Sequence, residues 1–98
     1  MVFHVDFTET AISDLHEAVS YYNSKSPGLG LRMFREVEGV IEKILLLPEA
    51  YSRRFENVRA CSVKGFPYLV FYGIEYTTKK ITVLRIFNTW KDPVFNKE

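Results

Sequence analysis

The chain has 98 residues, a mass of 11.5 kDa and a net charge of +1 at pH 7, so it is one domain without room for a second. Apolar residues make up 47% and aromatic residues 15%, which excludes a disordered tail, a collagen-like repeat and a polybasic arm. Its one cysteine, Cys61, excludes an intrachain disulfide and a multi-cysteine zinc site. We therefore expect a single domain over residues 1–98, in the cytoplasm, where disulfides are rare.

No segment of the sequence predicts attachment to a membrane. Every apolar run is far shorter than the ~20 residues that span a bilayer. Residues 1–4 also lack the basic segment and long apolar core that mark a signal peptide.

The first half of the chain predicts a strand and two helices. Residues 2–7 alternate weakly and are rich in Val and Phe, which indicates a short strand. Thr8 suits the cap of a helix over 10–23, whose apolar side chains recur at steps of three and four. Ser26, which precedes a proline, suits the cap of a second amphipathic helix that ends at Pro48. Two such helices joined by a short loop form an antiparallel hairpin.

The second half predicts three strands, over residues 57–63, 66–75 and 81–88. The middle segment is apolar on both faces, which is typical of a central strand covered on at least one side. Short turns between the strands favour an antiparallel meander. The predicted fold is therefore α+β in the order β-α-α-β-β-β, with the helices packed on one face of the sheet and an irregular tail over 90–98.

Charged residues are distributed unevenly between the two halves. Residues 1–52 hold four basic and eight acidic residues, a net −4, whereas residues 53–98 hold nine basic and four acidic, a net +5. If the halves form different faces, one surface would suit an anionic partner. Chance clustering of solubilising charge explains the same counts equally well.

Cationic side chains in the second half are the candidates for chemistry, because the sequence carries no standard catalytic motif. Alternation along a strand would place Arg85 on one face with Val83 and Phe87. If Arg59 points to the same face, both guanidinium groups and Lys64 would reach one anion. The structural alternative is that the two arginines pair with acids or lie flat over the sheet.

Asn88, Trp90 and Lys91 follow the last strand directly. Cations beside aromatic rings can hold phosphates while bases stack, as in contacts to single-stranded RNA. Cations can also stabilise the charge that develops on phosphorus while a general base deprotonates the 2′-hydroxyl during RNA cleavage.

Five short stretches, in one order along nearly the whole chain, resemble a known family. They are Ala11–Leu15, Tyr21-Tyr22 before Ser26-Pro27, Ile44–Pro48 followed by Tyr51, Val58-Arg59 with Lys64–Tyr68, and Val83–Asn88 followed by Lys91–Pro93. The chain resembles the RelE/ParE superfamily, the toxins of bacterial type II toxin–antitoxin and plasmid-stabilisation modules. The resemblance implies a helical hairpin on a mostly antiparallel curled sheet and a cognate antitoxin, and a homodimer stays open. We expect no cofactor and no metal, since no pair of histidines stands at the spacing of metal ligands.

Two activities occur in that superfamily, and departures from its pattern favour one of them. RelE-like members cut mRNA on the ribosome and usually place an arginine in the central strand, but residues 68–72 contain none. Asn88 and Lys91 stand where many relatives carry His and Arg. The imidazole that could donate a proton and the guanidinium that could bind a phosphate at two points are therefore both missing. With the low net charge, these departures favour a ParE-like toxin that binds DNA gyrase through Asn88, Trp90 and Lys91.

Two other functions stay open at this point. A ribosome-dependent mRNA endonuclease would use Arg59, Lys64, Arg85 and Lys91 as its catalytic residues. A degenerate toxin would keep only a binding role.

Antitoxin binding would need an apolar surface that accepts a helix or an added strand. Tyr21, Tyr22, Leu31 and Phe34 are the candidates, with core packing as the alternative for the aromatic side chains. The basic second half would attract an acidic segment of the antitoxin.

Overall fold

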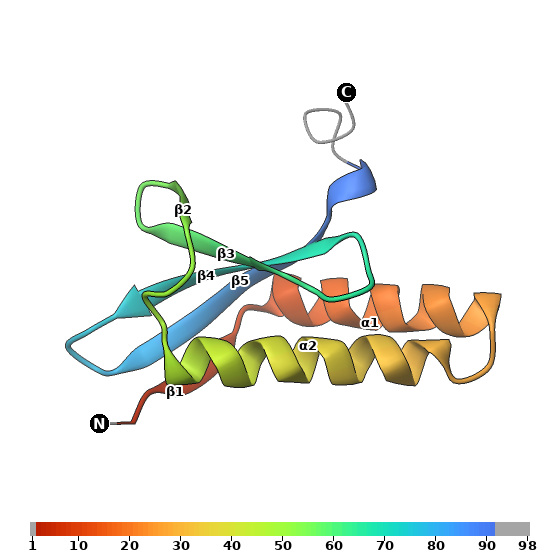
Figure 1. Cartoon of the computed structure of the whole chain (residues 1–98), viewed down its shortest axis with the longest axis horizontal. Coiled ribbons are helices and arrows are strands. Elements are labelled where there is room, and N and C mark those ends of the chain that lie inside the picture. Colours follow the sequence, from red (N-terminus) through yellow and green to blue (C-terminus); the bar gives the residue numbers. More distant parts are fainter. Residues whose placement is uncertain (1, 92–98) are drawn as a thin grey trace.

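The computed structural model describes residues 2–91 as one layer of helices against one sheet (Figure 1). The elements are β1 (His4–Phe7), α1 (Glu9–Lys25), α2 (Leu29–Leu46), β2 (Arg53–Phe55), β3 (Val58–Ser62), β4 (Tyr68–Glu75), β5 (Lys80–Asn88) and the 3₁₀ turn η1 (Thr89–Lys91). The five strands form one sheet in the order β1-β5-β4-β3-β2. β1 is parallel to β5 and the other neighbours are antiparallel, which confirms the predicted α+β class and the meander.

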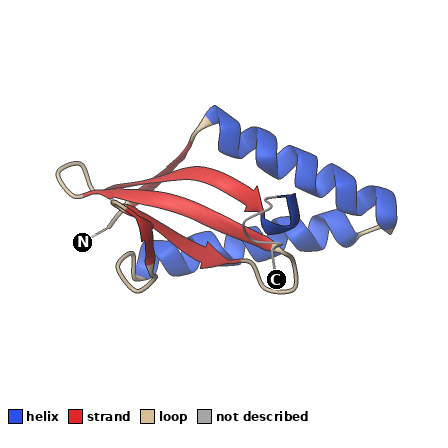
Figure 2. Ribbon diagram, turned by 90° about the horizontal axis from the view of Figure 1, so that it is seen from above, coloured by secondary structure: helices blue, strands red, loops and turns tan. Residues whose placement is uncertain are grey.

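Both helices cover the same face of the sheet, and their apolar sides form the main core with it (Figure 2). α1 contributes Ala11 and Ala18, and α2 contributes Met33, Val37 and Ile44 among others. No helix within residues 2–91 has the length and apolar character needed to cross a membrane.

Thr8 caps α1 as the sequence predicts. Its Oγ1 accepts a hydrogen bond from the Ala11 amide at 3.0 Å and donates one to the Leu84 carbonyl at 2.9 Å. The first bond satisfies an amide at the helix end, and the second ties that end to β5. One hydroxyl thus fixes where α1 begins and where it meets the sheet.

Ser26 does not cap the second helix, so that prediction is wrong. The Ser26 amide donates to the Tyr22 carbonyl and closes α1, while Gly28, with φ of +87°, is the residue that precedes and caps α2. Positive φ is accessible to glycine at little cost. A Cβ on Gly30 would lie 2.5 Å from the Val19 carbonyl oxygen, so the two helices approach closely at this turn.

β4 is the central strand, and its side chains from Tyr68 to Tyr72 are all buried, as predicted. Tyr68, Val70 and Tyr72 face the helices, whereas Leu69 and Phe71 belong to a smaller cluster on the other face. Figure 1 shows β2 and β3 rising away from the helices, so the sheet curls. β2 is an edge strand of three exposed residues, which the sequence analysis did not predict.

A bulge where β5 meets β4 changes which side chains share a face. Phe71 pairs with Arg85 but Tyr72 pairs with Val83, so Leu84 is the extra residue. Val83 and Ile86 face the helices, while Phe87 packs on the other face. The prediction of one common face is therefore wrong for Val83, whereas Arg85 and Phe87 do share a face, with the Arg85 guanidinium 5.7 Å from the centroid of the Phe87 ring. The predicted irregular tail begins instead as the η1 turn, and residues 92–98 lie outside the described part of the chain.

Candidate functional site

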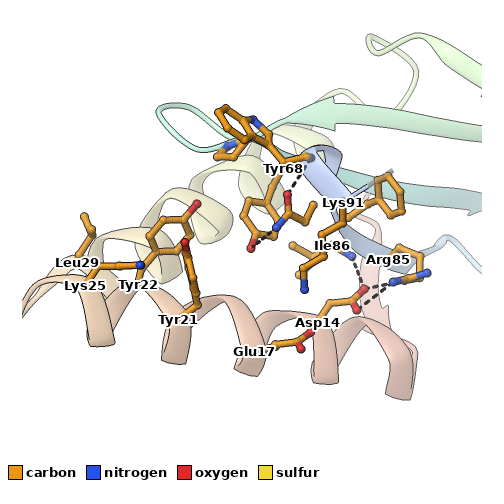
Figure 3. Close-up of a pocket in the computed structure, with 14 residues that line it drawn as sticks. Asp14, Glu17, Tyr21, Tyr22, Lys25, Leu29, Tyr68, Arg85, Ile86 and Lys91 are labelled. Carbon is orange, nitrogen blue, oxygen red and sulfur yellow. Dashed lines mark hydrogen bonds and ion pairs between the residues drawn. The ribbon is translucent and has the colours of Figure 1, made fainter. Parts of the chain in front are cut away.

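A pocket of about 690 Å³ lies between α1 and the end of β5 (Figure 3). Its walls come from α1, the start of α2, the end of the β3–β4 loop, the start of β4, β5 and η1. The lining residues are Asp14, Glu17, Tyr21, Tyr22, Lys25, Leu29, Pro67, Tyr68, Arg85–Asn88, Trp90 and Lys91.

The pocket exists because β1 is shorter than β5. β1 ends at Phe7, which pairs with Val83, so the rest of β5 has no strand beside it on that edge. Asp14 of α1 takes the place of a strand there, since its Oδ2 accepts a hydrogen bond from the Ile86 amide at 3.0 Å. A backbone amide that would otherwise lack a strand partner is thereby satisfied.

The same carboxylate holds Arg85, as the dashed lines in Figure 3 show. Arg85 donates from Nε to Asp14 Oδ2 at 2.7 Å and from Nη2 to Oδ1 at 3.2 Å, which is a two-point contact. The hydrogen bond to Asp14 raises the pKa of the Arg85 guanidinium above its usual value. Arg85 therefore contributes a fixed, paired cation and cannot transfer a proton near neutral pH.

Tyrosine rings form the helical side of the pocket. Tyr21 and Tyr22 meet edge to face with ring centroids 5.1 Å apart, and Tyr22 packs likewise on Phe66 at 4.8 Å. The Lys25 ammonium lies 5.0 Å from the Tyr21 ring centroid. Tyr21 is 51% exposed, so this wall offers an aromatic surface with a cation beside it.

Tyr68 closes the floor of the pocket with a phenol that stays protonated. Burial, followed by the neighbouring Tyr22 and Glu17, raises its pKa to about 12. Asn88 Nδ2 donates to the Tyr68 hydroxyl at 3.4 Å. No histidine lines the pocket within the described residues, so its groups bind and orient better than they exchange protons near neutral pH.

The η1 turn sets the rim of the pocket. The Thr89 amide and hydroxyl both donate to the Pro67 carbonyl, at 2.9 and 3.0 Å, and the Trp90 amide donates to Asn88 Oδ1 at 2.9 Å. These bonds anchor the turn, and Trp90 extends from it with 70% of its surface exposed. Lys91 lies on the same rim.

The structure brings some predicted site residues together and separates others. Asn88, Trp90, Lys91 and Arg85 share the pocket with Tyr21 and Tyr22, so the residues assigned to target and antitoxin lie on one surface.

Leu31, Arg59 and Lys64 do not line the pocket. Leu31 is 50% exposed on α2, and Lys64 is exposed in the β3–β4 turn. Arg59 Nη1 donates to the carbonyls of Glu49 and Tyr51, at 3.2 and 2.7 Å, and thereby fastens the loop after α2. The expected convergence of Arg59, Lys64 and Arg85 on one anion is therefore not seen.

Asp14 was not among the predicted site residues, and neither were Lys25 and Tyr68. A signal was present, because Asp14 stands three residues after Ala11 and four before Ala18, which are both buried. An acid at that spacing lies on the buried side of the helix and needs a partner there.

Cys61 lies outside the pocket and is buried in β3, where burial raises the pKa of its thiol. Within residues 2–91, no group of three His, Cys, Asp or Glu side chains is placed to hold a metal ion.

The chain is thus a small α+β domain in which a helical hairpin packs on a curled sheet, with an aromatic and cationic pocket at the end of β5. The family model for the ParE toxin of the type II toxin–antitoxin system parDE matches residues 5–93, and the chain belongs to this family. It is therefore a type II toxin. Among curated proteins, no sequence matches.

Solved structures share the fold at low sequence identity. A chain from the chromosomal ParDE system of P. aeruginosa is 18% identical, with a TM-score of 0.76 over 88% of this chain and 95% of that one. The isolated E. coli RelE toxin is 14% identical, with a TM-score of 0.66 over 97% and 93%. A chain of the toxin–antitoxin complex RelBE2 from Mycobacterium tuberculosis is 20% identical, with a TM-score of 0.60 over 90% and 99%.

Proposed function

We propose that this toxin acts in the cytoplasm by binding DNA gyrase and blocking it, and that a cognate antitoxin neutralises it. The observation that carries the proposal is the two-point contact between Asp14 and Arg85. In a nuclease, the guanidinium of Arg85 would donate its N–H groups to a phosphate. Here its Nε and Nη2 already donate to the carboxylate of Asp14 in the same chain. The pocket is thus better suited to hold a protein surface than to cleave RNA.

The rim of the pocket supports this proposal. Tryptophan and tyrosine are among the residues that most often dominate protein–protein binding energy. Trp90 and Tyr21 are the most exposed rings of the pocket, with Lys91 and Lys25 beside them. We assign target binding to Asn88, Trp90 and Lys91.

Antitoxin binding is supported by the likeness to structures of toxin–antitoxin complexes. The α1–α2 hairpin leaves several large apolar side chains exposed, among them Ile12, Leu31 and Phe34. Such a surface is suited to an amphipathic helix.

Supercoiling of relaxed plasmid by purified gyrase tests the proposed target. The chain should inhibit the reaction, and the double variant Trp90→Ala/Lys91→Ala should weaken the inhibition by about 100-fold if these two residues act as hot spots. Arg54→Ala, which removes an exposed cation from β2 outside the pocket, is the matched control and should inhibit like the parent. Full supercoiling activity in the presence of excess parent chain would refute the proposal.

An mRNA endonuclease is the second candidate, favoured by the three cations Lys25, Arg85 and Lys91 that line one pocket. Primer extension on translated mRNA would then reveal new 5′ ends after expression of the chain. Their loss in Arg85→Ala, with supercoiling unaffected, would replace the gyrase proposal with this one. If neither activity is found and expression does not slow growth, the chain is a degenerate toxin with a binding role alone.

A further inference from the structure

We infer that Asp14 is a specificity-determining residue of the pocket at the end of β5, because its carboxylate keeps RNA out of a site whose cations would otherwise hold a phosphate. The inference rests on the proposed function only in treating this pocket as a protein-binding surface. It gives Asp14 a role in the choice of partner, in addition to its role in joining α1 to β5.

The cations of the pocket are the part of the site that would favour RNA. Lys25, Arg85 and Lys91 all line it, and the two lysines are exposed and form no ion pair within residues 2–91. Tyr21 and Trp90 line it as well. Phosphates bind to cations and unpaired bases stack on aromatic rings, so this combination is typical of contacts to single-stranded RNA.

The carboxylate of Asp14 opposes such a contact from a fixed position. Its Oδ2 accepts hydrogen bonds from Arg85 Nε and the Ile86 amide at 2.7 and 3.0 Å, and its Oδ1 accepts one from Arg85 Nη2 at 3.2 Å. The side chain is largely buried, so water screens its charge only weakly. It cannot turn away without leaving the Ile86 amide unpaired. A phosphate that approaches Arg85 therefore meets a negative charge that stays in place.

Glu17 provides an internal comparison for Asp14. It lies one turn further along α1 and also lines the pocket, as Figure 3 shows. Unlike Asp14, it is exposed and forms no ion pair within residues 2–91. Loss of either acid removes one negative charge from the pocket, but only loss of Asp14 releases a guanidinium. Discrimination against a wrong partner often depends on one repulsive element of this kind.

Fluorescence anisotropy with a short labelled oligouridylate tests the inference. The parent chain should bind this RNA weakly, and Asp14→Asn should bind it about ten-fold more tightly, since Arg85 gains a hydrogen bond to a charged phosphate. The asparagine still offers an oxygen to the Ile86 amide, so the fold should be kept. The slope of log affinity against log salt concentration should steepen by about 0.7, as expected for one added phosphate contact to a single strand.

Three further variants separate the release of Arg85 from a change in charge. Glu17→Gln should tighten RNA binding by only about two-fold. Glu38→Gln, at an exposed residue of α2 outside this pocket, should leave it unchanged. Asp14→Asn/Arg85→Gln should return to the affinity of the parent, because the gain depends on the guanidinium. A loss of local structure would not depend on it.

Several results would overturn the inference. They are no gain in Asp14→Asn, an equal gain in Glu17→Gln, and tight binding that persists in the double variant with Arg85→Gln. If Asp14→Asn does not fold by circular dichroism, Asp14→Ser, whose hydroxyl oxygen is also an acceptor, takes its place and should show the same gain.

The assay contains no gyrase, so its outcome is separate from that of the proposed target. If the parent chain leaves supercoiling unaffected while Asp14→Asn gains RNA affinity, the proposed target is refuted and the role of Asp14 stands. If the parent already binds RNA as tightly as Asp14→Asn does, Asp14 excludes nothing and the inference is overturned, whether or not gyrase is inhibited.

Discussion

Tyr72 is the largest side chain that is fully enclosed by the core, and it carries a polar group into it. Its hydroxyl donates to the Pro48 carbonyl at 2.6 Å, which satisfies the phenol and fastens the loop that follows α2. Burial raises its pKa to about 12, against an ordinary value of 10.0, although the cation of Arg59 opposes the shift. The folded chain therefore holds the proton of Tyr72 more tightly than the unfolded chain does.

This difference in pKa predicts that the free energy of unfolding falls at alkaline pH. The stabilisation linked to Tyr72 is complete below pH 10 and is lost as the pH rises from 10 towards 12, because the unfolded phenol ionises first. Tyr72→Phe should lower the free energy of unfolding by about 1–2 kcal/mol at pH 7, since the Pro48 carbonyl loses its donor. It should also make the fall above pH 10 shallower, though not absent, because the pKa of Tyr68 is likewise about 12.

Urea unfolding at several pH values from 7 to about 11 measures both effects. Tyr21→Phe, which removes an exposed phenol, is the control and should change the free energy of unfolding at pH 7 by less than about 0.5 kcal/mol. An equally steep alkaline fall in Tyr72→Phe and in the parent would contradict the assignment.

At the scale of the element, α1 substitutes for a strand along the open edge of β5. Asp14 performs this role through two interactions of different kinds, one with the Ile86 amide and one with the Arg85 side chain. The Asp14 side chain is 13% exposed and that of Arg85 is 45% exposed, so the two interactions differ in their contact with water. Two substitutions can separate them.

Asp14→Asn keeps an acceptor for the Ile86 amide but removes the negative charge, whereas Asp14→Ala removes both. We expect Asp14→Asn to cost less than about 1 kcal/mol of unfolding free energy and Asp14→Ala about 1–3 kcal/mol. Asp6→Asn, at an exposed pair with Lys80 at 3.8 Å, should cost less than about 0.5 kcal/mol. Equal losses for the two Asp14 variants would mean that the charge, and not the amide bond, joins the helix to the strand.

The elements themselves could largely be predicted from the sequence, because each carries a local signal. Thr8 before a run of apolar residues at helical spacing predicted the start of α1, and the apolar run around Val70 predicted a central strand covered on at least one side. The prediction for Ser26 was wrong because a serine before a proline is compatible both with the start of a helix and with the end of one. The positive φ of Gly28 places the start of α2 after that glycine. β2 was not predicted because its three residues are all exposed and show no alternation of apolar and polar side chains.

The site was predicted only in part, for a reason that lies in the register of the strands. The order of the chain sufficed to bring Asn88, Trp90 and Lys91 beside one another, since they lie at the end of a single strand and in the turn that follows it. The face of the sheet on which Arg85 lies depends on the bulge at Leu84, which shifts the alternation of side chains between the two faces. No residue type in this segment predicts the bulge. Strict alternation therefore failed at the position where α1 reaches the sheet.

At the scale of the whole molecule, the first strand, β1, completes the sheet by pairing with the last strand, β5. β1 pairs with residues 80–83 of β5, and Val5 and Phe7 pack on the core while His4 and Asp6 face outwards. Without β1 this edge of β5 would expose its amides and the side chains of Ile81 and Val83.

Deleting residues 1–7 should therefore abolish the cooperative unfolding transition and promote aggregation, as measured by near-UV circular dichroism, urea titration and size-exclusion chromatography. His4→Thr/Asp6→Thr alters the outward positions of the same strand and should stay within about 1 kcal/mol of the parent. A monomeric deletion variant with a sharp transition would show that β5 does not depend on β1.

The parallel pairing of β1 with β5 has a consequence for synthesis. A ribosome makes β1 first, and the segment that completes the sheet emerges only after every other strand. A nascent fragment that stops before residue 80 lacks the strand on which α1, β1 and β4 all converge, and it also lacks Asn88, Trp90 and Lys91. Interrupted translation would thus release harmless pieces, and poisoning would begin only with chains whose translation had passed η1.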